Sequence, residues 1–307
     1  MTSRSTNGRT VIRYAVFSAS MLFGTCITTS ACAHGYAGTR FFPATIATDD
    51  PAVADELSLP TLSRLDGEIE ISGEFSKRIT KRLGFSIKGA WTRANEDGEA
   101  IKGFENIETS LNWQFLTNAE HEAIVTAGVS VEWGGTGAQR IGAEETSVVT
   151  PTLYFGKGFG DLPERANWAR PFAVTGLIGY AVPARAFDDA GDAIPSAITG
   201  GFTVQYSLPY LNANIRDRNW PSWVNRLTPL VELAIEKPVR RAGGEAVTGS
   251  INPGFVWAGK HMQFGAEAII PVNDDSGNGV GWTVQAHFFL DDLLPRSIGR
   301  PIFGRRR

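Results

Sequence analysis

Long stretches of this chain alternate between apolar and polar side chains with a period of two residues. In the stretch at 68–79, Ile69, Ile71 and Phe75 alternate with glutamate and serine at the positions between them. Successive side chains of a β-strand point to opposite faces of the sheet. The stretch therefore predicts a strand with one apolar face and one polar face.

The same alternation predicts ten further strands, and all of them are long. We expect roughly 10 to 14 residues per strand, whereas a strand of a soluble protein has about 5 or 6. A tilted strand that crosses a bilayer needs about 9 to 11 residues. Gly176, Pro229 and Pro253 lie inside three of the segments and weaken those three assignments. The ten segments are 85–92, 107–115, 122–133, 147–158, 170–182, 198–208, 227–236, 247–258, 261–271 and 280–290.

The connections between these segments differ in length. Those near 80–83, 117–120 and 259–260 are tight. Longer connections, rich in Gly, Asp and Glu, lie at 95–103, 134–145, 184–196, 237–245 and 273–279. Bacterial outer-membrane barrels have short periplasmic turns and longer outer loops. The pattern therefore predicts an all-β fold, an antiparallel transmembrane up-and-down β-barrel.

The strand number depends on the segment before residue 66. With the tight joins in the periplasm, the strand at 68–79 runs inward, so the chain must have crossed the membrane once before it. The segment 36–48, with Phe41, Phe42 and Ile46, is the candidate for that crossing. Counting it gives about twelve strands and places both termini in the periplasm. Ten strands is the alternative, if residues 34–65 are a plug or a tether.

One connection departs from the length rule. The join at 209–225 is long although it should be periplasmic, and it contains Trp220 and Trp223. Either a short amphipathic piece at the inner membrane interface or an irregular loop fits it. A soluble periplasmic β-sandwich is the alternative architecture for the whole chain.

Tryptophans near the ends of apolar strand faces support the membrane interpretation. Amphipathic aromatic rings favour the headgroup level of a bilayer, although ordinary packing would explain any one of them. The expected membrane-interface aromatics are Trp91, Trp113, Trp133, Trp257 and Trp282.

The first 33 residues have the features of a secretory signal peptide. Arg4, Arg9 and Arg13 precede an apolar stretch, and cleavage is expected between Ala33 and His34. A lipoprotein signal with lipid on Cys32 is the alternative. The domains expected are the signal at 1–33, the N-terminal segment at 34–65, the barrel at 66–290 and a periplasmic tail at 291–307.

Composition excludes several classes of function for the exported chain. Both cysteines of the sequence, Cys26 and Cys32, precede the cleavage site, so neither a disulfide scaffold nor a thiolate metal site is expected. Removing the three signal arginines from 29 basic residues leaves 26 against 32 acidic residues. This excess of negative charge is unfavourable for nucleic-acid binding.

The polar strand faces would line the barrel interior. Rings of carboxylates there would select cations in a pore. The alternative is a narrow lumen filled with ion pairs, since buried charges usually persist by pairing. The lumen-lining candidates are Glu68, Glu70, Glu74, Arg78, Lys88, Glu108, Glu122, Glu132, Glu232, Glu236, Glu267 and His287.

Nothing in the sequence predicts catalysis, a cofactor or a metal. A serine-hydrolase motif of the G-x-S-x-G type is absent, and the strand parity of His261 and His287 places them on opposite faces. Acidic pairs such as Asp188-Asp189 and Asp274-Asp275 lack an EF-hand spacing. No enzyme activity is expected, and a lipid-modifying barrel enzyme is the least favoured alternative.

The last strand and its exit, Gln285–Pro295, together with Arg40–Pro51 and Glu56–Pro60, carry a resemblance to a known group. The chain resembles uncharacterised proteobacterial barrels that are similar to the phenol-degradation-pathway (MetA-type) transporter family. The resemblance implies an outer-membrane location and passage of small, partly hydrophobic or aromatic molecules. It carries over no site residue.

Three functions follow as expectations. The first is a passive, porin-like channel or transporter for a small-molecule solute in the Gram-negative outer membrane. The second is a structural or accessory barrel with a closed, ion-paired lumen, and the third is the barrel enzyme. The expected partners are outer-membrane lipid and the outer-membrane assembly machinery.

Overall fold

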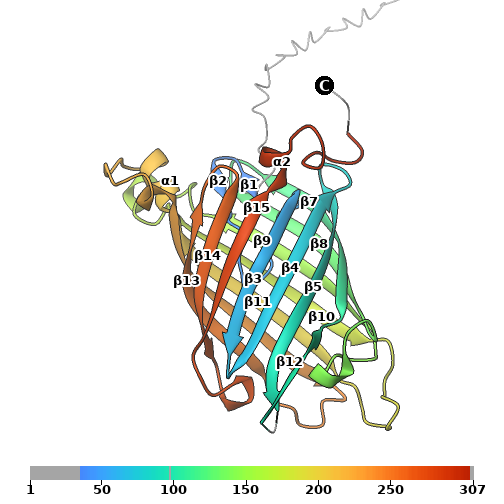
Figure 1. Ribbon diagram of the computed structural model, residues 1–307. Coiled ribbons are helices and arrows are strands. Elements are labelled where there is room, and N and C mark those ends of the chain that lie inside the picture. Colours follow the sequence, from blue (N-terminus) through green and yellow to red (C-terminus); the bar gives the residue numbers. More distant parts are fainter. Residues whose placement is uncertain (1–34, 97, 305–307) are drawn as a thin grey trace, which may run out of the picture. The chain divides into compact units, whose positions relative to one another are not determined.

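The long strands form a closed antiparallel barrel. A computed structural model describes residues 35–96 and 98–304 (Figure 1). Each of the twelve barrel strands pairs with its neighbours along the chain, and the last strand pairs with the first, so the sheet closes. The predicted all-β barrel of twelve strands is confirmed, and closure excludes a β-sandwich.

The first six strand segments are β3 (Glu56–Leu65), β4 (Glu68–Arg78), β5 (Leu83–Glu96), β6 (Glu99–Phe104), β7 (Ile107–Asn118) and β8 (Ala123–Trp133). The others are β9 (Val148–Gly158), β10 (Phe172–Pro183), β11 (Ser196–Tyr206), β12 (Leu227–Arg240), β13 (Thr248–Ala258), β14 (Met262–Pro271) and β15 (Gly281–Phe289).

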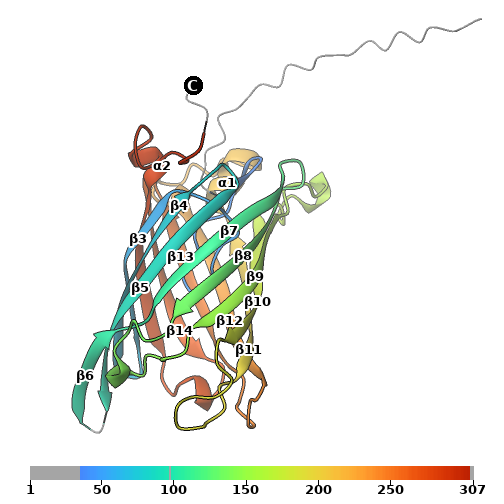
Figure 2. The same ribbon diagram turned by 90° about the vertical axis from the view of Figure 1, so that its right-hand side faces the viewer.

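The segments β6 and β7 together make one barrel strand. β6 pairs with the second half of β5, from Trp91 to Glu96, and β7 pairs with its first half, from Leu83 to Lys88. The β5–β6 hairpin extends beyond the neighbouring strands (Figure 2). The predicted loop at 95–103 is therefore wrong, because most of it is strand.

The prediction that residues 36–48 form the first strand is also wrong. Residues 36–41 form a small hairpin of β1 (Tyr36–Ala37) and β2 (Arg40–Phe41), and the barrel begins at β3 rather than at residue 66. A bulge between Ser58 and Thr61 shifts the register of β3, so its apolar alternation is broken in the sequence. Pro60, within the bulge, also opposes a strand assignment.

The two ends of the barrel differ. We call the end that carries β1, β2, α1 (Leu208–Asn214) and α2 (Leu290–Leu293) the helical end, and the opposite end the loop end (Figure 1). The tight joins predicted near 80–83, 117–120 and 259–260 all lie at the helical end. The connection predicted at 209–225 runs from within α1 into a short 3-10 helix, Val224–Arg226. The β3–β4 turn at the loop end is tight because Asp66 and Gly67 both adopt positive φ, as a two-residue hairpin turn requires.

Apolar side chains point outward and polar side chains point inward. Large hydrophobic residues are exposed along the strands, for example Ile71, Ile178 and Phe264 at 40%, 59% and 45%. Threonine, glutamine and glutamate side chains are buried inside, with Thr203 and Glu232 at 0% exposure. This distribution is the reverse of that in a water-soluble protein. Among the described residues, none of the helices has the length and apolar character needed to cross a bilayer.

Candidate functional site

Residues 42–55 lie inside the barrel, and we call them the lumenal segment. Its central anchor is Glu232 on β12, whose carboxylate is fully buried. The backbone N–H groups of Ile46 and Thr48 donate to it at 2.9 and 2.7 Å, and the Thr48 hydroxyl donates at 2.7 Å. The Thr48 hydroxyl also lies 3.0 Å from that of Thr203 on β11. Charge-assisted hydrogen bonds of this kind are stronger than neutral ones, so Glu232 fixes the segment in the lumen.

Three other strands hold the lumenal segment through its main chain. Gln263 on β14 donates from its side-chain amide to the carbonyl of Ala44 at 2.7 Å. Thr126 on β8 donates to the carbonyl of Pro51, and the side-chain carbonyl of Gln114 on β7 accepts from a backbone N–H of the segment at 3.1 Å. The main-chain polar groups of an extended segment inside a barrel need such partners, because they have no sheet neighbour.

Glycines on the inner wall leave room for the same segment. A Cβ atom at Gly201 would lie 2.8 Å from the Thr48 methyl group, and one at Gly265 would lie 2.5 Å from Ile46. The other two glycines of this kind are Gly156, beside Pro51 and Phe42, and Gly84, beside Val53. The four glycines belong to four different strands. The barrel wall is therefore shaped around the lumenal segment.

Gly201→Val is expected to displace the segment. Overpacking costs about 1–3 kcal/mol, which raises the population of the displaced segment by a factor of about 5 to 150. Limited proteolysis of the folded barrel, with cleavage mapped within 42–55, measures this. The matched control is Gly200→Val, because the neighbouring Gly200 faces open space. Equal cleavage of the two variants would contradict the prediction.

A buried ion pair holds the chain before the lumenal segment. Arg40 on β2 is fully buried and donates from Nε to Glu122 at 3.0 Å and from Nη1 to the carbonyl of Pro171 at 3.1 Å. Its guanidinium lies 3.7 Å from the ring centre of Tyr210 on α1. Burial lowers the pKa of Arg40, and burial together with nearby Glu122 raises the pKa of Tyr210. Arg40 therefore connects β2 to three other chain segments at the helical end.

A second ion pair holds the end of the lumenal segment. The carboxylate of Asp55 is fully buried and accepts from Lys77 Nζ at 2.5 Å and from the backbone N–H of Arg78 at 2.8 Å. Its other oxygen accepts from Nε and Nη2 of Arg78 at 2.9 and 2.7 Å. Buried ion pairs thus hold the chain just before the lumenal segment, at Arg40, and at its last residue, Asp55.

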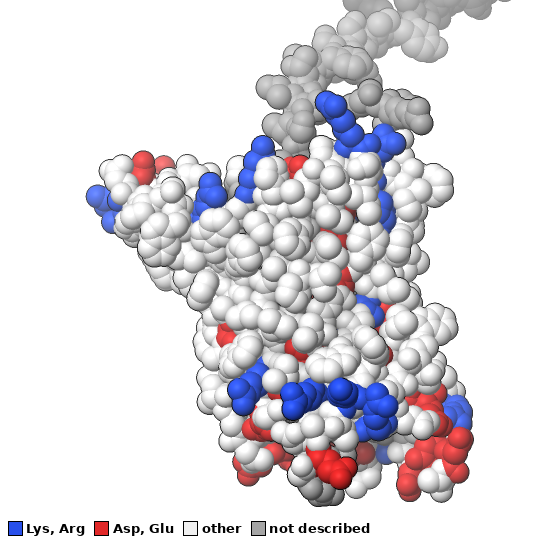
Figure 3. Space-filling model, in the orientation of Figure 1, with Lys and Arg blue, Asp and Glu red and all other residues white. Residues whose placement is uncertain are grey.

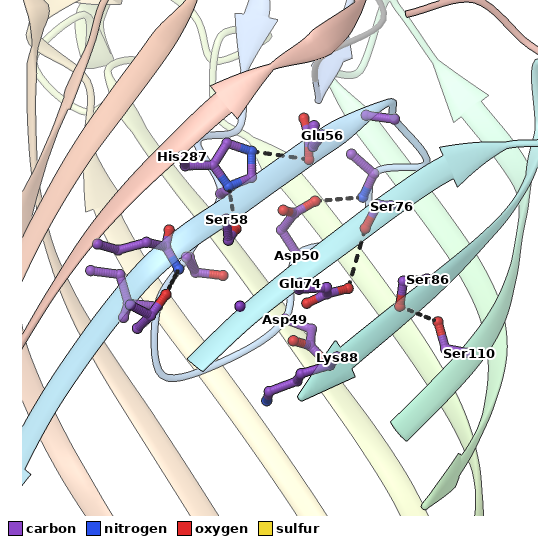
Figure 4. A pocket seen from close by; sticks show the side chains of 18 of the residues that line it. Asp49, Asp50, Glu56, Ser58, Glu74, Ser76, Ser86, Lys88, Ser110 and His287 are labelled. Atoms are coloured by element: carbon purple, nitrogen blue, oxygen red, sulfur yellow. Dashed lines mark hydrogen bonds and ion pairs between the residues drawn. The ribbon is translucent and has the colours of Figure 1, made fainter. Parts of the chain in front are cut away.

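A polar cavity of about 130 Å³ remains between the lumenal segment and the wall formed by β3, β4, β5, β7 and β15. Asp49 of the segment lies beside Glu74 and Lys88 of the wall (Figure 4). Glu108 lines the same cavity. Carboxylates outnumber the single lysine there, so the lining of the cavity is predominantly acidic.

His287 reaches this cavity between a serine and a glutamate. Its Nδ1 lies 2.7 Å from the Ser58 hydroxyl, and its Nε2 lies 3.2 Å from the Glu56 carboxylate (Figure 4). The Glu56 contact is close enough for an ion pair but lacks hydrogen-bond alignment. A catalytic triad needs a base that its third member orients by a hydrogen bond. We therefore interpret the group as a cross-strand polar cluster, which the pairing of His287 with Ser58 brings together.

The structure separates the sequence-predicted lumen residues into groups. Glu74, Lys88, Glu108 and His287 line the cavity. Glu68 and Glu70 line a second space of about 460 Å³ with Ser63, Asp66 and Asn95. These two glutamates therefore lie toward the loop end and not beside Asp49.

The remaining predicted residues have structural partners or lie elsewhere. Arg78 and Glu232 hold the lumenal segment. Glu122 precedes β8 instead of lying on a strand, and it binds Arg40. Glu267 is buried beside Glu232. Glu132 accepts from the Asn106 side chain at 3.0 Å, and Glu236 is exposed near the loop end of β12.

Sequence reasoning missed Arg40, Thr48 and Asp55 as anchors. Their partners are far away along the chain; Thr48 and Glu232, for example, are 184 residues apart. The inward glycines carried a signal, because a glycine within a strand often marks the close approach of another chain segment.

The five predicted interface tryptophans lie at two levels. Trp257 is next to the helical end of β13, and Trp113 lies in the helical half of β7. Arg226 lies 5.5 Å from the ring centre of Trp257. Trp91, Trp133 and Trp282 are near the loop end. Two separated levels are the arrangement expected of aromatic girdles. The predicted cleavage site, Ala33 and His34, lies outside the described residues.

Several solved structures are similar to this chain. The KdgM porin is 12% identical, with 76% of this chain and 98% of that chain covered and a TM-score of 0.46. The NanC porin is 9% identical, with the same coverage and a TM-score of 0.46. The β-domain of the Bordetella autotransporter BrkA is 11% identical, covers 76% of this chain and 96% of its own, and has a TM-score of 0.36.

No family model and no curated protein matches the sequence. The resemblance to the phenol-degradation-pathway group is therefore unconfirmed. Because the three TM-scores are below 0.5, the fold assignment rests on the strand pairing of the chain itself. By that pairing, the chain is a closed twelve-stranded antiparallel barrel with its own N-terminal segment inside the lumen.

Proposed function

We propose that this protein is an outer-membrane channel for small solutes, with the lumenal segment as a resident plug that narrows the passage. The outward apolar side chains and the two tryptophan levels support insertion into a bilayer. The short turns and the hairpin of β1 and β2 support placing the helical end in the periplasm.

The observation that carries the proposal is the acidic cavity beside the lumenal segment. A twelve-stranded barrel is intermediate between small barrels filled by side chains and wide, open porins. The lumenal segment occupies part of this interior, but Asp49, Glu74, Lys88 and Glu108 still surround about 130 Å³ of space. Such a charged lining favours small polar or cationic solutes over the partly hydrophobic ones that the resemblance implies.

Changing Glu68, Glu70 and Glu74 together to glutamine is expected to reduce cation preference. The three carboxylates lie along the proposed path, so removing their charge removes attraction for cations without changing side-chain size. Reversal potentials of single channels in planar bilayers under a salt gradient measure the effect. We expect cation-over-anion selectivity to fall by at least about half.

The matched control removes three acidic groups from the outside of the helical end: Glu120→Gln, Glu164→Gln and Asp217→Asn. All three are exposed. Selectivity equal to that of the unmodified protein is expected for this control. An equal loss in both triple variants would show that total charge, rather than the lumen, sets the preference.

A structural barrel with a closed lumen is the second candidate. It is favoured by the buried ion pairs just before the lumenal segment and at its last residue. A folded barrel that inserts into bilayers and never conducts would support this candidate over the channel.

A further inference from the structure

Cations form a row on the outer wall of the barrel near the loop end. Arg64 on β3 is paired in register with Ile69 on β4, which is paired with Arg93 on β5, which is paired with Lys102 on β6. All three cations are exposed, and they share the outward face with the exposed apolar residues of these strands. Figure 3 shows a band of Lys and Arg across this face, with acidic side chains of the loops beyond it.

The row lies at the edge of the apolar wall. One step toward the helical end, the outward positions in register are Val284, Leu62, Ile71, Trp91 and Phe104. These side chains are apolar or aromatic, and Phe104 is 69% exposed. In the register of the cation row itself, Trp282 is the partner of Arg64. Along each of these strands, the outward side chains change from apolar to cationic within two residues. The row therefore lies at the level expected for the lipid headgroups.

Among the described residues, Arg64, Arg93 and Lys102 have no ion pair. Arg93 and Lys102 are directly opposite each other, and like charges in that position are destabilising. Arg140 adds a fourth cation nearby, because its Nε donates to the carbonyl of Lys102. An anion held between these groups would remove the repulsion.

Along the strands that follow β6 the row does not continue, and a single outward cation, Lys237 on β12 beside Ile198, is the next one in register. On the strands that follow, the outward positions near the loop end include Trp133, Val149, Val182 and Ile198, all at least 37% exposed. A cluster limited to neighbouring strands indicates a site of defined size rather than a general surface charge.

We propose that Arg64, Arg93 and Lys102 bind the phosphate groups of a phosphorylated lipid headgroup in the outer leaflet, of the diphosphoryl glycolipid (lipid A) class. Guanidinium groups bind phosphate oxygens in pairs, and an ammonium group adds a third charged donor. Arg64 and Arg93 are two strand spacings apart, roughly 10 Å, which suits a headgroup with two phosphates. The apolar row beside the cations contacts the acyl chains of the same lipid.

The inference rests on the proposed membrane location but not on conduction. The full exported chain, folded in detergent, is titrated with diphosphoryl lipid A and with its monophosphoryl derivative, and bound lipid is measured by native mass spectrometry. The test variant is Arg64→Gln with Arg93→Gln. The control is Lys237→Gln with Arg240→Gln, which removes two exposed cations near the loop end of β12, six strands away from β5.

The expected result is one tightly bound diphosphoryl lipid on the unmodified protein and on the control. In the test variant the affinity falls about tenfold or more, since two charge-assisted contacts are lost. The monophosphoryl lipid binds the unmodified protein more weakly than the diphosphoryl lipid does.

Equal affinity in the test variant and the unmodified protein would overturn the inference, and so would an equal loss in the control. Displacement of the lipid by inorganic phosphate would show a site for free anions and would also overturn it. A barrel that conducts but binds no lipid A rejects the lipid site alone. A barrel that binds lipid A but never conducts rejects the channel alone.

Discussion

Deletion of residues 35–54 is expected to raise single-channel conductance several-fold. The deletion removes the hairpin of β1 and β2 and nearly all of the lumenal segment, while Asp55 stays in place to bind Lys77 and Arg78. The lumen would then contain water where Ile46 and Thr48 now contact the wall. Conductance of a water-filled pore rises with its free cross-section, and a twelve-stranded barrel without a plug approaches the open type.

A disulfide tests the opposite case, in which the lumenal segment is locked in its place. The hydroxyls of Thr48 and Thr203 are 3.0 Å apart, and a chain that starts at His34 has no cysteine of its own. The oxidised variant Thr48→Cys with Thr203→Cys is expected to keep the low conductance, with no openings to the level of the deletion variant. The single variant Thr203→Cys is the control for oxidation.

A deletion variant that conducts no better than the unmodified protein would show that the lumenal segment does not limit the passage.

Asp55→Asn is expected to destabilise the folded barrel by about 3–5 kcal/mol, because it leaves buried cations without their counter-ion. Asp55 is the acceptor for Lys77 Nζ and for three N–H groups of Arg78, and its side chain is fully buried. The amide keeps the volume of the side chain but removes its charge. Urea unfolding of the protein in lipid vesicles, followed by tryptophan fluorescence, measures the change in the free energy of unfolding.

An exposed ion pair provides the matched control for Asp55. Asp189 accepts from Arg185 at 2.5 Å, but the two side chains are 74% and 45% exposed. Asp189→Asn is expected to cost less than about 1 kcal/mol, as is typical of surface pairs. If Asp55→Asn costs no more than Asp189→Asn, the pair formed by Asp55 with Lys77 and Arg78 does not stabilise the barrel.

The period-two alternation predicted which segments form barrel strands and which face of each strand points inward. Glu74, Lys88 and Glu108 could be placed in the lumen from the sequence because parity along one strand is a local property. Trp282 could be placed near a strand end because it follows a predicted loop, whereas Trp113 lies in the middle of β7, which continues to Asn118. The first strand escaped this reasoning, because the bulge between Ser58 and Thr61 changes the parity within β3.

What fills the lumen was decided by tertiary structure. The path of residues 42–55 depends on Glu232, Gln263 and Thr126, which belong to three strands distant in sequence, and on the space left by glycines such as Gly201 and Gly265. These partners meet the segment only when the sheet has closed. The cation row likewise has no sequence pattern of its own, since Arg64, Arg93 and Lys102 become neighbours through strand register. The sequence alone thus determined the barrel and its two faces, while the occupied lumen and the cation row came from pairing between distant segments.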